Sequence, residues 1–303
     1  MTTQIAILDE PAVQRLLRYE DLIPAVARGL ADLSQGRVVQ PVRAVLPIAE
    51  HKGFFAVMPA YAGAMGAKLV TFYPHNRDIH THHAVIVLFK PETGEPLAMM
   101  DGRLITEMRT AAASAVATQQ LARANASTLA ILGSGVQAGS HLAAIRHVRS
   151  IKEVRVWSPR NAKEFAARHG VQAAATAQDA VRGADVVVVA TSAQTPVLEG
   201  RWLSPGAHVN AVGATRPTWR EMDDDLMGRA RVFVDSKEAA TKEAGDVIAA
   251  RQEVAEIGSV IAGKADGRSN DTEITVFKSV GVAVEDVVSA KLVYDAHQRA
   301  HGA

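Results

Sequence analysis

The 303-residue chain contains no cysteine, which excludes disulfides, thiolate metal sites and a cysteine nucleophile. It also lacks an excess of charge of one sign, because 33 lysines and arginines face 32 acids, so we expect neither nucleic acid nor an anionic membrane as a partner. No apolar run approaches the ~18 residues of a membrane span. The start shows no basic region followed by an apolar core, as a signal peptide would. These absences predict a cytoplasmic protein.

What is present is enough sequence for two domains with different patterns. The first third reads mostly as antiparallel strands, and from Leu129 onward short strands alternate with helices, as in a doubly wound parallel sheet. Between the two parts we expect a helix at Thr106–Leu121, and at the end an amphipathic helix at Gly281–His297. The expected strands of the first part are Ile5–Leu8, Arg37–Ile48, Gly53–Pro59, Ala67–Tyr73, Ala84–Phe89 and Leu97–Met100. The predicted fold is α/β, a Rossmann-type sheet preceded by a smaller domain with a largely antiparallel sheet.

The second part opens with the pattern of a dinucleotide-binding corner. Thr128–Leu132 is an apolar run typical of a buried parallel strand. Gly133 then permits a tight turn, Gly135 lacks the Cβ that would hold the backbone away from a pyrophosphate, and Ala138 lets the next helix pack closely. That helix, expected at Val136–Val148, would direct its free N–H groups at phosphates.

The end of the second strand of this part indicates which dinucleotide is preferred. A carboxylate at this place binds the ribose 2′-hydroxyl of NAD(H) and repels the 2′-phosphate of NADP(H). Here the strand Glu153–Trp157 is followed by Ser158, Pro159 and Arg160, and Arg160 could hold a phosphate through its charged fork. We therefore favour NADP(H), with NAD(H) as the alternative if Arg160 is only a solvated residue at a helix start.

Three long cations stand in otherwise apolar segments of the first part: Arg43, Lys68 and Arg109. Burying such side chains is unfavourable unless an anion meets them. No matching acids stand nearby in the sequence, so we expect an anionic ligand, such as a substrate carboxylate. The alternative is that each cation reaches solvent at the end of its element.

Four histidines between residues 75 and 83 raise the question of a metal site. His80 and His82 would share one face of a strand, but no carboxylate stands at ligand spacing. We expect no metal here and assign His82 to the substrate pocket.

Several longer motifs in order carry a resemblance that covers nearly the whole chain. They are Met58–Tyr61, Lys68–Tyr73, Met100–Gly102, Ile105–Thr106, Arg109–Ala112, Leu132–Ala138, Asn210–Gly213 and Val276–Ser279. With them the sequence resembles the ornithine cyclodeaminase/mu-crystallin family. The segment Gly206–Asp223 is especially similar to the ketimine reductase branch of that family.

The resemblance implies a homodimer in which residues 1–113, completed by a C-terminal helix at 280–303, hold the dimer contact and the substrate. Residues 114–279 would form the Rossmann domain. The reaction implied is hydride transfer between the nicotinamide cofactor and a substrate with a carboxylate next to a C=N bond. Pyrroline-2-carboxylate and piperideine-2-carboxylate are such ketimines, and their reduction gives amino acids.

The same resemblance assigns roles to individual residues. Arg43 would clamp the substrate carboxylate, Lys68 would lie beside the imine nitrogen, and Arg109 would contact the substrate or the cofactor. Met58 and His82 complete the implied substrate-binding set. The implied cofactor contacts are Thr81, His82, Arg109, Thr110, Gly133, Ser134, Gly135, Val136, Gln137, Ser158, Arg160, Asn161, Thr191, Ser192, Val212, Glu243 and Ser279.

One departure from the family pattern bears on the reaction. Cyclodeaminases carry an aspartate where this chain has Thr215, and threonine cannot act as a carboxylate base near neutral pH. Imine reduction is therefore favoured over conversion of ornithine to proline and ammonia. Alanine dehydrogenase-like activity and non-enzymatic binding of a small carboxylate stay open as alternatives.

Overall fold

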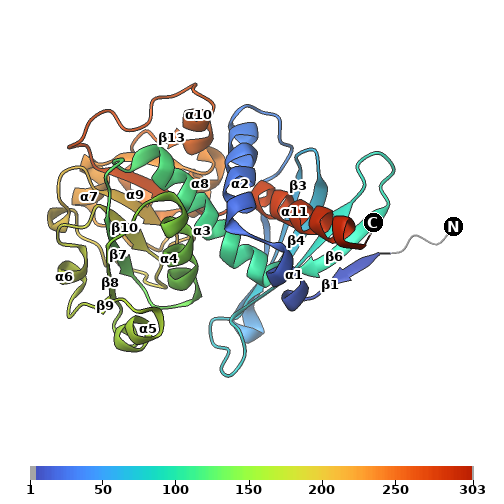
Figure 1. Ribbon diagram of the computed structural model, residues 1–303, viewed down its shortest axis with the longest axis horizontal. Coiled ribbons are helices and arrows are strands. Elements are labelled where there is room, and N and C mark those ends of the chain that lie inside the picture. The colour runs from blue at the N-terminus through green and yellow to red at the C-terminus, as the bar shows by residue number, and fades with distance from the viewer. Residues whose placement is uncertain (1–4, 302–303) are drawn as a thin grey trace. The chain divides into compact units, whose positions relative to one another are not determined.

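The computed structural model describes residues 5–301 (Figure 1). The chain forms two compact units: unit 1 is Met1–Arg109 with Val282–Ala303, and unit 2 is Thr110–Gly281. The boundary falls inside helix α3 (Gly102–Leu121), and the chain returns to unit 1 for its last helix. Each unit is built around a sheet of its own.

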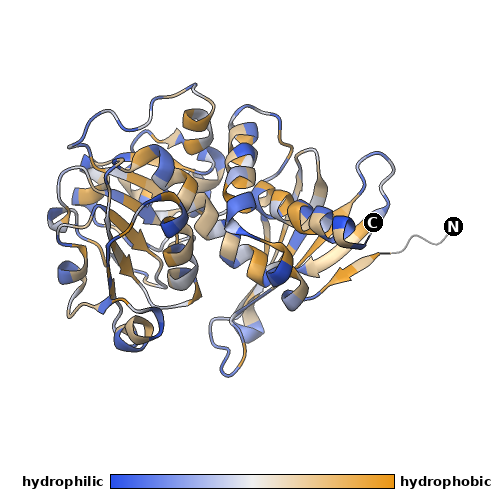
Figure 2. Ribbon diagram, in the orientation of Figure 1, coloured by the Kyte–Doolittle hydropathy of each residue, from blue (hydrophilic) through white to orange (hydrophobic). Residues whose placement is uncertain are grey.

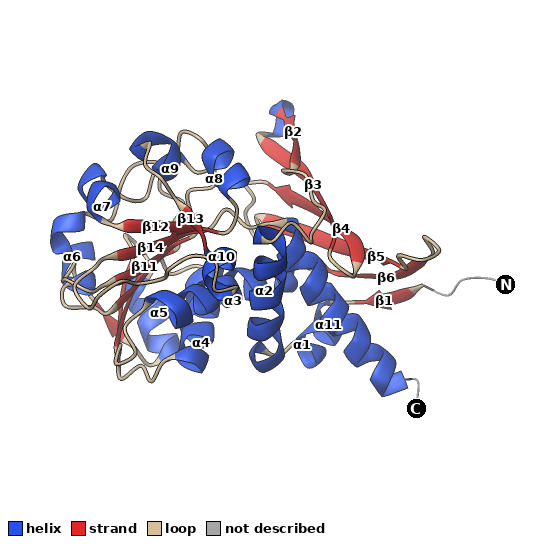
Figure 3. Ribbon diagram, turned by 90° about the horizontal axis from the view of Figure 1, so that it is seen from above, coloured by secondary structure: helices blue, strands red, loops and turns tan. Residues whose placement is uncertain are grey.

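Unit 1 is a six-stranded sheet with helices on one face (Figure 3). The strand order is β1-β6-β5-β4-β3-β2, in which β1 pairs with β6 in parallel and all other neighbours are antiparallel. Its elements are β1 (Ala6–Leu8), α1 (Glu10–Leu16), α2 (Tyr19–Ser34), β2 (Ala44–Ile48), a 3-10 turn at Ala49–His51, β3 (Gly53–Tyr61), β4 (Met65–Phe72), β5 (His82–Phe89), β6 (Pro96–Asp101) and α11 (Ala283–His301).

The two faces of this sheet differ in what covers them. Helix α11 packs against β3, β4 and β5, so every second residue of β3, such as Met58, is buried beneath it. The residues that point the other way remain apolar but are exposed: Ile7 by 66%, Met99 by 40% and Val85 by 38%. Ile7 and Met99 are direct cross-strand partners. The sheet therefore presents a second apolar face on the side opposite α11.

Unit 2 is an eight-stranded sheet, ordered β13-β12-β14-β11-β10-β7-β8-β9, with every pair parallel. Its strands are β7 (Thr128–Leu132), β8 (Glu153–Trp157), β9 (Gln172–Ala173), β10 (Val186–Val189), β11 (His208–Ala211), β12 (Arg231–Val234), β13 (Ala255–Glu256) and β14 (Thr275–Lys278). Its helices are α4 (Val136–Val148), α5 (Ala162–His169), α6 (Ala177–Val181), α7 (Asp224–Arg229), α8 (Lys237–Glu243), α9 (Gly245–Ala250) and α10 (Ile257–Ile261), with a 3-10 turn at Gly200–Trp202.

The centre of unit 2 explains why its strands are so short and apolar. Each valine of β10 is fully buried, as parallel strands are when helices cover both faces. Figure 2 shows the central strands in the hydrophobic colour and the surrounding loops largely in the hydrophilic one. Within residues 5–301, no helix joins the length and the apolar composition that crossing a membrane requires.

The predicted fold class, a Rossmann-type parallel sheet with a smaller and largely antiparallel one, is confirmed. One strand prediction is wrong in its first half: the expected strand at Arg37–Ile48 is a strand only from Ala44, with an isolated bridge at Val39. Pro41 explains the difference, because it has no N–H for a ladder and restricts the residue before it. Helix α3 also begins earlier than expected, at Gly102, and the central strand β14 was not predicted.

Candidate functional site

The glycine corner of unit 2 has the geometry that its sequence predicts. Gly133 lies at φ +121°, and a Cβ there would stand 2.3 Å from the Ala190 carbonyl oxygen, so only glycine fits. Gly135 is the N-cap of α4, and a Cβ on it would meet nothing within 4 Å. The protein's own packing therefore does not demand glycine at 135, and the open space before the helix suits a pyrophosphate. Ala138 is fully buried, as close helix packing requires.

Two serines join the corner to the end of β8. The hydroxyls of Ser134 and Ser158 are 2.8 Å apart, and Ser158 Oγ also accepts a hydrogen bond from the Asn161 backbone N–H at 3.2 Å. Arg160 beside them is exposed. Two hydroxyls thus meet where the second strand ends, and an exposed arginine follows two residues later in the chain; hydroxyl and guanidinium donors of this kind suit a phosphate.

The carboxyl ends of β10 and β11 are tied together by Glu221, which the sequence analysis missed. Its Oε1 accepts hydrogen bonds from Thr191 N at 2.9 Å and Thr191 Oγ1 at 2.6 Å. Its Oε2 accepts from Gly213 N at 2.7 Å and Ala214 N at 3.0 Å. Burial raises the pKa of Glu221, against the opposing pull of Lys278. Glu221 therefore fixes two loops in which the expected cofactor contacts Thr191, Ser192 and Val212 stand.

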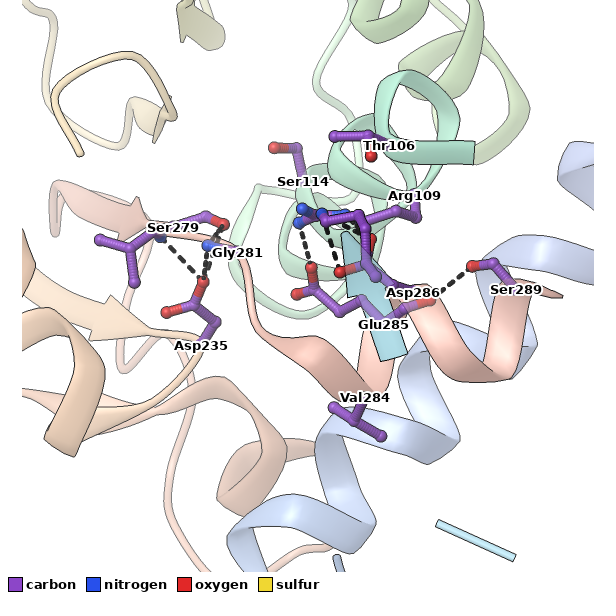
Figure 4. A network of polar contacts seen from close by, with 12 residues as sticks. Thr106, Arg109, Ser114, Asp235, Ser279, Gly281, Val284, Glu285, Asp286 and Ser289 are labelled. Atoms are coloured by element: carbon purple, nitrogen blue, oxygen red, sulfur yellow. Dashed lines mark hydrogen bonds and ion pairs between the residues drawn. The ribbon is translucent and has the colours of Figure 1, made fainter. Parts of the chain in front are cut away.

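The remaining expected cofactor contacts of unit 2 lie on different elements and differ in burial. Ser279 is 1% exposed, and its hydroxyl donates to Asp235 Oδ2 at 2.8 Å, so another group of the chain already uses this donor (Figure 4). Asp235 Oδ2 also accepts from the Val280 and Gly281 backbone N–H groups. Glu243 is the half-buried last residue of α8. Val136 and Gln137 form the first turn of α4, and Thr110 is a half-buried residue of α3.

In unit 1 the structure brings Lys68 and Arg109 together around one carboxylate. Asp286 Oδ1 accepts from Lys68 Nζ at 2.9 Å and from Arg109 Nε at 2.8 Å, and Oδ2 lies 2.8 Å from Lys68 Nζ. Arg109 Nη1 also contacts Glu285 Oε2 at 2.5 Å (Figure 4). Lys68 is 1% exposed and Arg109 4%. The cluster therefore joins β4, α3 and α11 in a region almost closed to solvent.

These contacts correct one step of the sequence argument. We took Arg43, Lys68 and Arg109 to lack matching acids, but Glu285 and Asp286 meet two of them. The acids are more than 170 residues away along the chain, on the helix expected at 281–297, so proximity in sequence gave no hint of them. Two consecutive acids in a stretch of valines and alanines were the available signal, because α11 buries them: Glu285 is 1% exposed and Asp286 is fully buried.

The electrostatics of the cluster favour a Lys68 that can give up its proton. Burial, the charge of Arg109 and the charge of Arg43 lower the pKa of Lys68 to about 7, while Asp286 acts to raise it. Burial also opposes the charge of Arg109, but Asp286 and Glu285 outweigh it and raise the pKa of that guanidinium. Arg43, half-buried just before β2, is therefore close enough to act on Lys68. A lysine with such a pKa exchanges a proton readily near neutral pH.

The other expected substrate residues lie around this cluster or further along the same strands. Met58 on β3 is the direct cross-strand partner of Lys68 and is 2% exposed. His82 opens β5 and lies with its ring centroid 4.8 Å from that of Phe72. Thr81, exposed beside it, accepts a backbone hydrogen bond from Tyr73. Among the described residues, no three histidine, cysteine, aspartate or glutamate side chains gather in a way that could hold a metal ion.

Comparisons with known proteins identify the family of the chain. The model of the ornithine cyclodeaminase/mu-crystallin family matches residues 4–301. The chain is 49% identical to the ketimine reductase mu-crystallin of Mus musculus, over 96% of each chain. Among solved structures it resembles Thermococcus litoralis Delta(1)-pyrroline-2-carboxylate reductase in complex with NADH and L-proline, with 36% identity, a TM-score of 0.92 and 98% of each chain covered. It also resembles an archaeal alanine dehydrogenase dimer with bound NAD, with 34% identity, a TM-score of 0.92 and 99% and 97% of the two chains covered. The chain belongs to the ornithine cyclodeaminase/mu-crystallin family, as its motifs predict.

Proposed function

We propose that the chain is an NAD(P)H-dependent reductase that converts ketimines, 2-imino acids such as pyrroline- or piperideine-2-carboxylate, into amino acids. The observation that carries the proposal is the buried ammonium of Lys68, held by Asp286 beside Arg109. Relatives named as ketimine reductase and pyrroline-2-carboxylate reductase support it. Thr215 in place of a carboxylate argues against ornithine cyclisation.

The glycine corner of unit 2 would hold the nicotinamide cofactor, whose chemistry would be to supply a hydride for the carbon of the C=N bond and to become oxidised. The nitrogen gains a bond to hydrogen as the C=N π bond breaks, and Lys68 Nζ donates that proton. Arg43 binds the substrate carboxylate and so orients the imine. Arg109 keeps a positive charge beside Lys68, which weakens the hold of Lys68 on its proton.

The glycine corner fits the dinucleotide that the proposal requires. Gly135 leaves open space at the N-terminus of α4, and the Ser134 and Ser158 hydroxyls lie beside it. Because no carboxylate follows β8 and Arg160 does, we propose that NADP(H) is preferred over NAD(H). Replacing Arg160 with Ala should raise the Kd for NADPH about tenfold and leave that for NADH within twofold, a loss typical of one charged contact. Fluorescence titration of both cofactors measures this, and equal effects on both would contradict the preference.

We further propose that the protein is a homodimer that pairs the apolar face of the unit 1 sheet opposite α11. The exposed Ile7, Val85 and Met99 support this, because such a face is unfavourable in water. The alanine dehydrogenase neighbour is described as a dimer. Met99→Lys should shift the protein toward monomer in sedimentation, whereas Lys90→Glu, an exposed change in the turn between β5 and β6, should not. The cytoplasmic location stays a prediction.

The proposed activity is tested with a panel of 2-imino acids, each with NADPH and with NADH, followed by loss of absorbance at the nicotinamide band. Oxidation of NADPH with a cyclic ketimine is expected. Ammonia release from ornithine with no net change in cofactor would instead show a cyclodeaminase. Oxidation of alanine with NAD(P)⁺ would show an alanine dehydrogenase. Tight binding of a carboxylate with no turnover of any substrate would show a binding protein.

A further inference from the structure

Helix α11 contributes a carboxylate that reaches both cations of the unit 1 cluster. One oxygen of Asp286 accepts hydrogen bonds from Lys68 Nζ at 2.9 Å and Arg109 Nε at 2.8 Å, and the other lies 2.8 Å from Lys68 Nζ. We propose that Asp286 is a positioning residue for imine reduction, which holds the Lys68 ammonium in place and in its charged form until the substrate takes its proton. This inference rests on the proposed function, in which Lys68 is the proton donor.

A lysine in this place needs such a partner for two reasons. Its side chain has four rotatable carbons and a compact point charge, so a buried ammonium stays in one position only where an acceptor holds it. An ammonium carries three donors, and the hydrogen bond to Asp286 Oδ1 uses one of them. Further N–H groups of the same ammonium are then available to an imine nitrogen.

The second reason for a partner is that Lys68 must keep its positive charge. Lys68 is faced by Arg109 from α3, by Arg43 from the segment before β2 and by Asp286 from α11, while its cross-strand partners Met58 and Ile86 are uncharged. Burial and the two arginines drive the proton off the amine, and Asp286 opposes them. A neutral amine could not donate to the imine, so the carboxylate decides whether the acid is present at neutral pH.

The neighbouring acid, Glu285, offers a matched comparison. It is also buried, stands one residue earlier on the same helix and contacts Arg109 Nη1 at 2.5 Å. Its carboxylate acts on the cluster through Arg109, whereas Asp286 touches Lys68 itself. Asp286→Asn and Glu285→Gln each remove one buried negative charge that contacts Arg109, but only Asp286→Asn removes a charge that also contacts Lys68.

The test measures the protonation of Lys68 without using activity. Because Lys68 is 1% exposed, NMR replaces a chemical reagent: the Lys68 Cε resonance of protein carrying ¹³C-labelled lysine, followed across pH 5–10, gives the pKa of this amine in the intact protein. In Asp286→Asn the pKa should fall by about one to three pH units, the usual influence of an adjacent opposite charge. In Glu285→Gln it should fall by less than half as much. The alkaline limb of the kcat/KM profile should move by the same amount in each variant.

Asp286→Glu keeps the negative charge, so it remains informative if Asp286→Asn does not fold. This variant should keep the Lys68 pKa close to that of the wild type and lose mainly kcat, about tenfold, because the ammonium is displaced. Equal shifts in Asp286→Asn and Glu285→Gln, or none, would overturn the inference while leaving ketimine reduction by the wild type intact. If the wild type reduces no ketimine although the pKa shift in Asp286→Asn is found, the proposed function is what fails, and the role of Asp286 in the reaction fails with it.

Discussion

Each unit buries a cluster of opposite charges, and the two clusters are built differently. In unit 1, the carboxylates of Asp286 and Glu285 accept hydrogen bonds from side-chain cations at 2.5–2.9 Å. In unit 2, the fully buried Lys278 lies 3.8 Å from Glu221 and 3.7 Å from Asp246, and within residues 5–301 its Nζ makes no hydrogen bond. The carboxylates of unit 2 are instead occupied largely by backbone N–H groups: those of Gly213 and Ala214 on Glu221, and those of residues 221 and 222 on Asp246.

The difference separates two uses of a buried carboxylate. A carboxylate that accepts from backbone amides fixes loops, and in unit 2 its charge is balanced by a lysine 3.7–3.8 Å away that donates no hydrogen bond to it. A carboxylate that accepts from side-chain cations sets where those cations stand and whether they keep their protons. We therefore expect changes in the unit 2 cluster to alter stability, and changes in the unit 1 cluster to alter rate and its pH dependence.

The largest expected effect is in unit 1. Replacing Lys68 with Ala should lower kcat/KM for a ketimine by about 10²- to 10⁴-fold, the usual contribution of a positioned general acid. Circular dichroism should be unchanged, because Asp286 keeps its hydrogen bond from Arg109. Lys90→Ala, an exposed lysine of the same unit, is the control and should keep full activity. Comparable activity in the two variants would contradict the expectation that the unit 1 cluster governs the reaction rate.

The next effect concerns unit 2. Glu221→Gln leaves Lys278 buried with less compensation and weakens the junction of β10 and β11, so the free energy of unfolding should fall by about 3–5 kcal/mol. Urea unfolding at pH 7.5 measures this. Asp225→Asn, which breaks an exposed ion pair with Arg229, should change stability by about 1 kcal/mol or less. An unchanged stability in Glu221→Gln, with a shifted pH profile of activity, would show that this cluster also serves the reaction.

The smallest expected effect is on the stability of unit 2 and comes from a buried neutral histidine. His141 is fully buried in unit 2, with Nε2 2.9 Å from Ser114 Oγ and Nδ1 2.7 Å from the Gln137 carbonyl oxygen. Burial lowers its pKa from 6.5 to about 4. The unfolded chain then binds the extra proton first, so stability is full above pH 6.5 and falls as the pH drops toward 4.

This loss of stability can be measured in one variant. Between pH 7.5 and 4.5 the His141 contribution to the free energy of unfolding should fall by about 2 kcal/mol. In His141→Gln the difference in urea stability between these two pH values should be smaller than in the wild type by that amount. His208, whose pKa burial lowers to about 3, remains in both proteins and keeps part of the acid sensitivity. An identical pH dependence in the variant would show that His141 is not the group that titrates.

Sequence reasoning succeeded where the determinants are local. Gly133 and Gly135 are defined by a turn and a helix start within a few residues, and β10 by four β-branched valines, a short run typical of a buried parallel strand. It also identified Lys68 and Arg109 as cations out of place. It did not pair them with Asp286: two consecutive acids among valines and alanines indicate burial, but which cations they meet depends on α11 packing against β3, β4 and β5.

Glu221 escaped for a related reason. It lies within a long motif that resembles the family. Its carboxylate accepts hydrogen bonds from backbone N–H groups that follow β10 and β11, 30 and 8 residues away in the chain. Strand β14 is only four residues long and ends in Lys278. A lysine is not expected in the middle of a parallel sheet, so the sequence did not indicate a strand here. Residues that act by joining distant segments were thus the ones that the sequence alone did not reveal.

The return of the chain to unit 1 for α11 has a consequence for biosynthesis. Lys68 and Arg109 are translated first, yet the acids that meet them, Glu285 and Asp286, are made more than 170 residues later. Unit 2 can fold while the earlier segment still waits for its final helix. A premature stop just before α11 should therefore yield a folded unit 2 attached to an aggregation-prone remnant of unit 1.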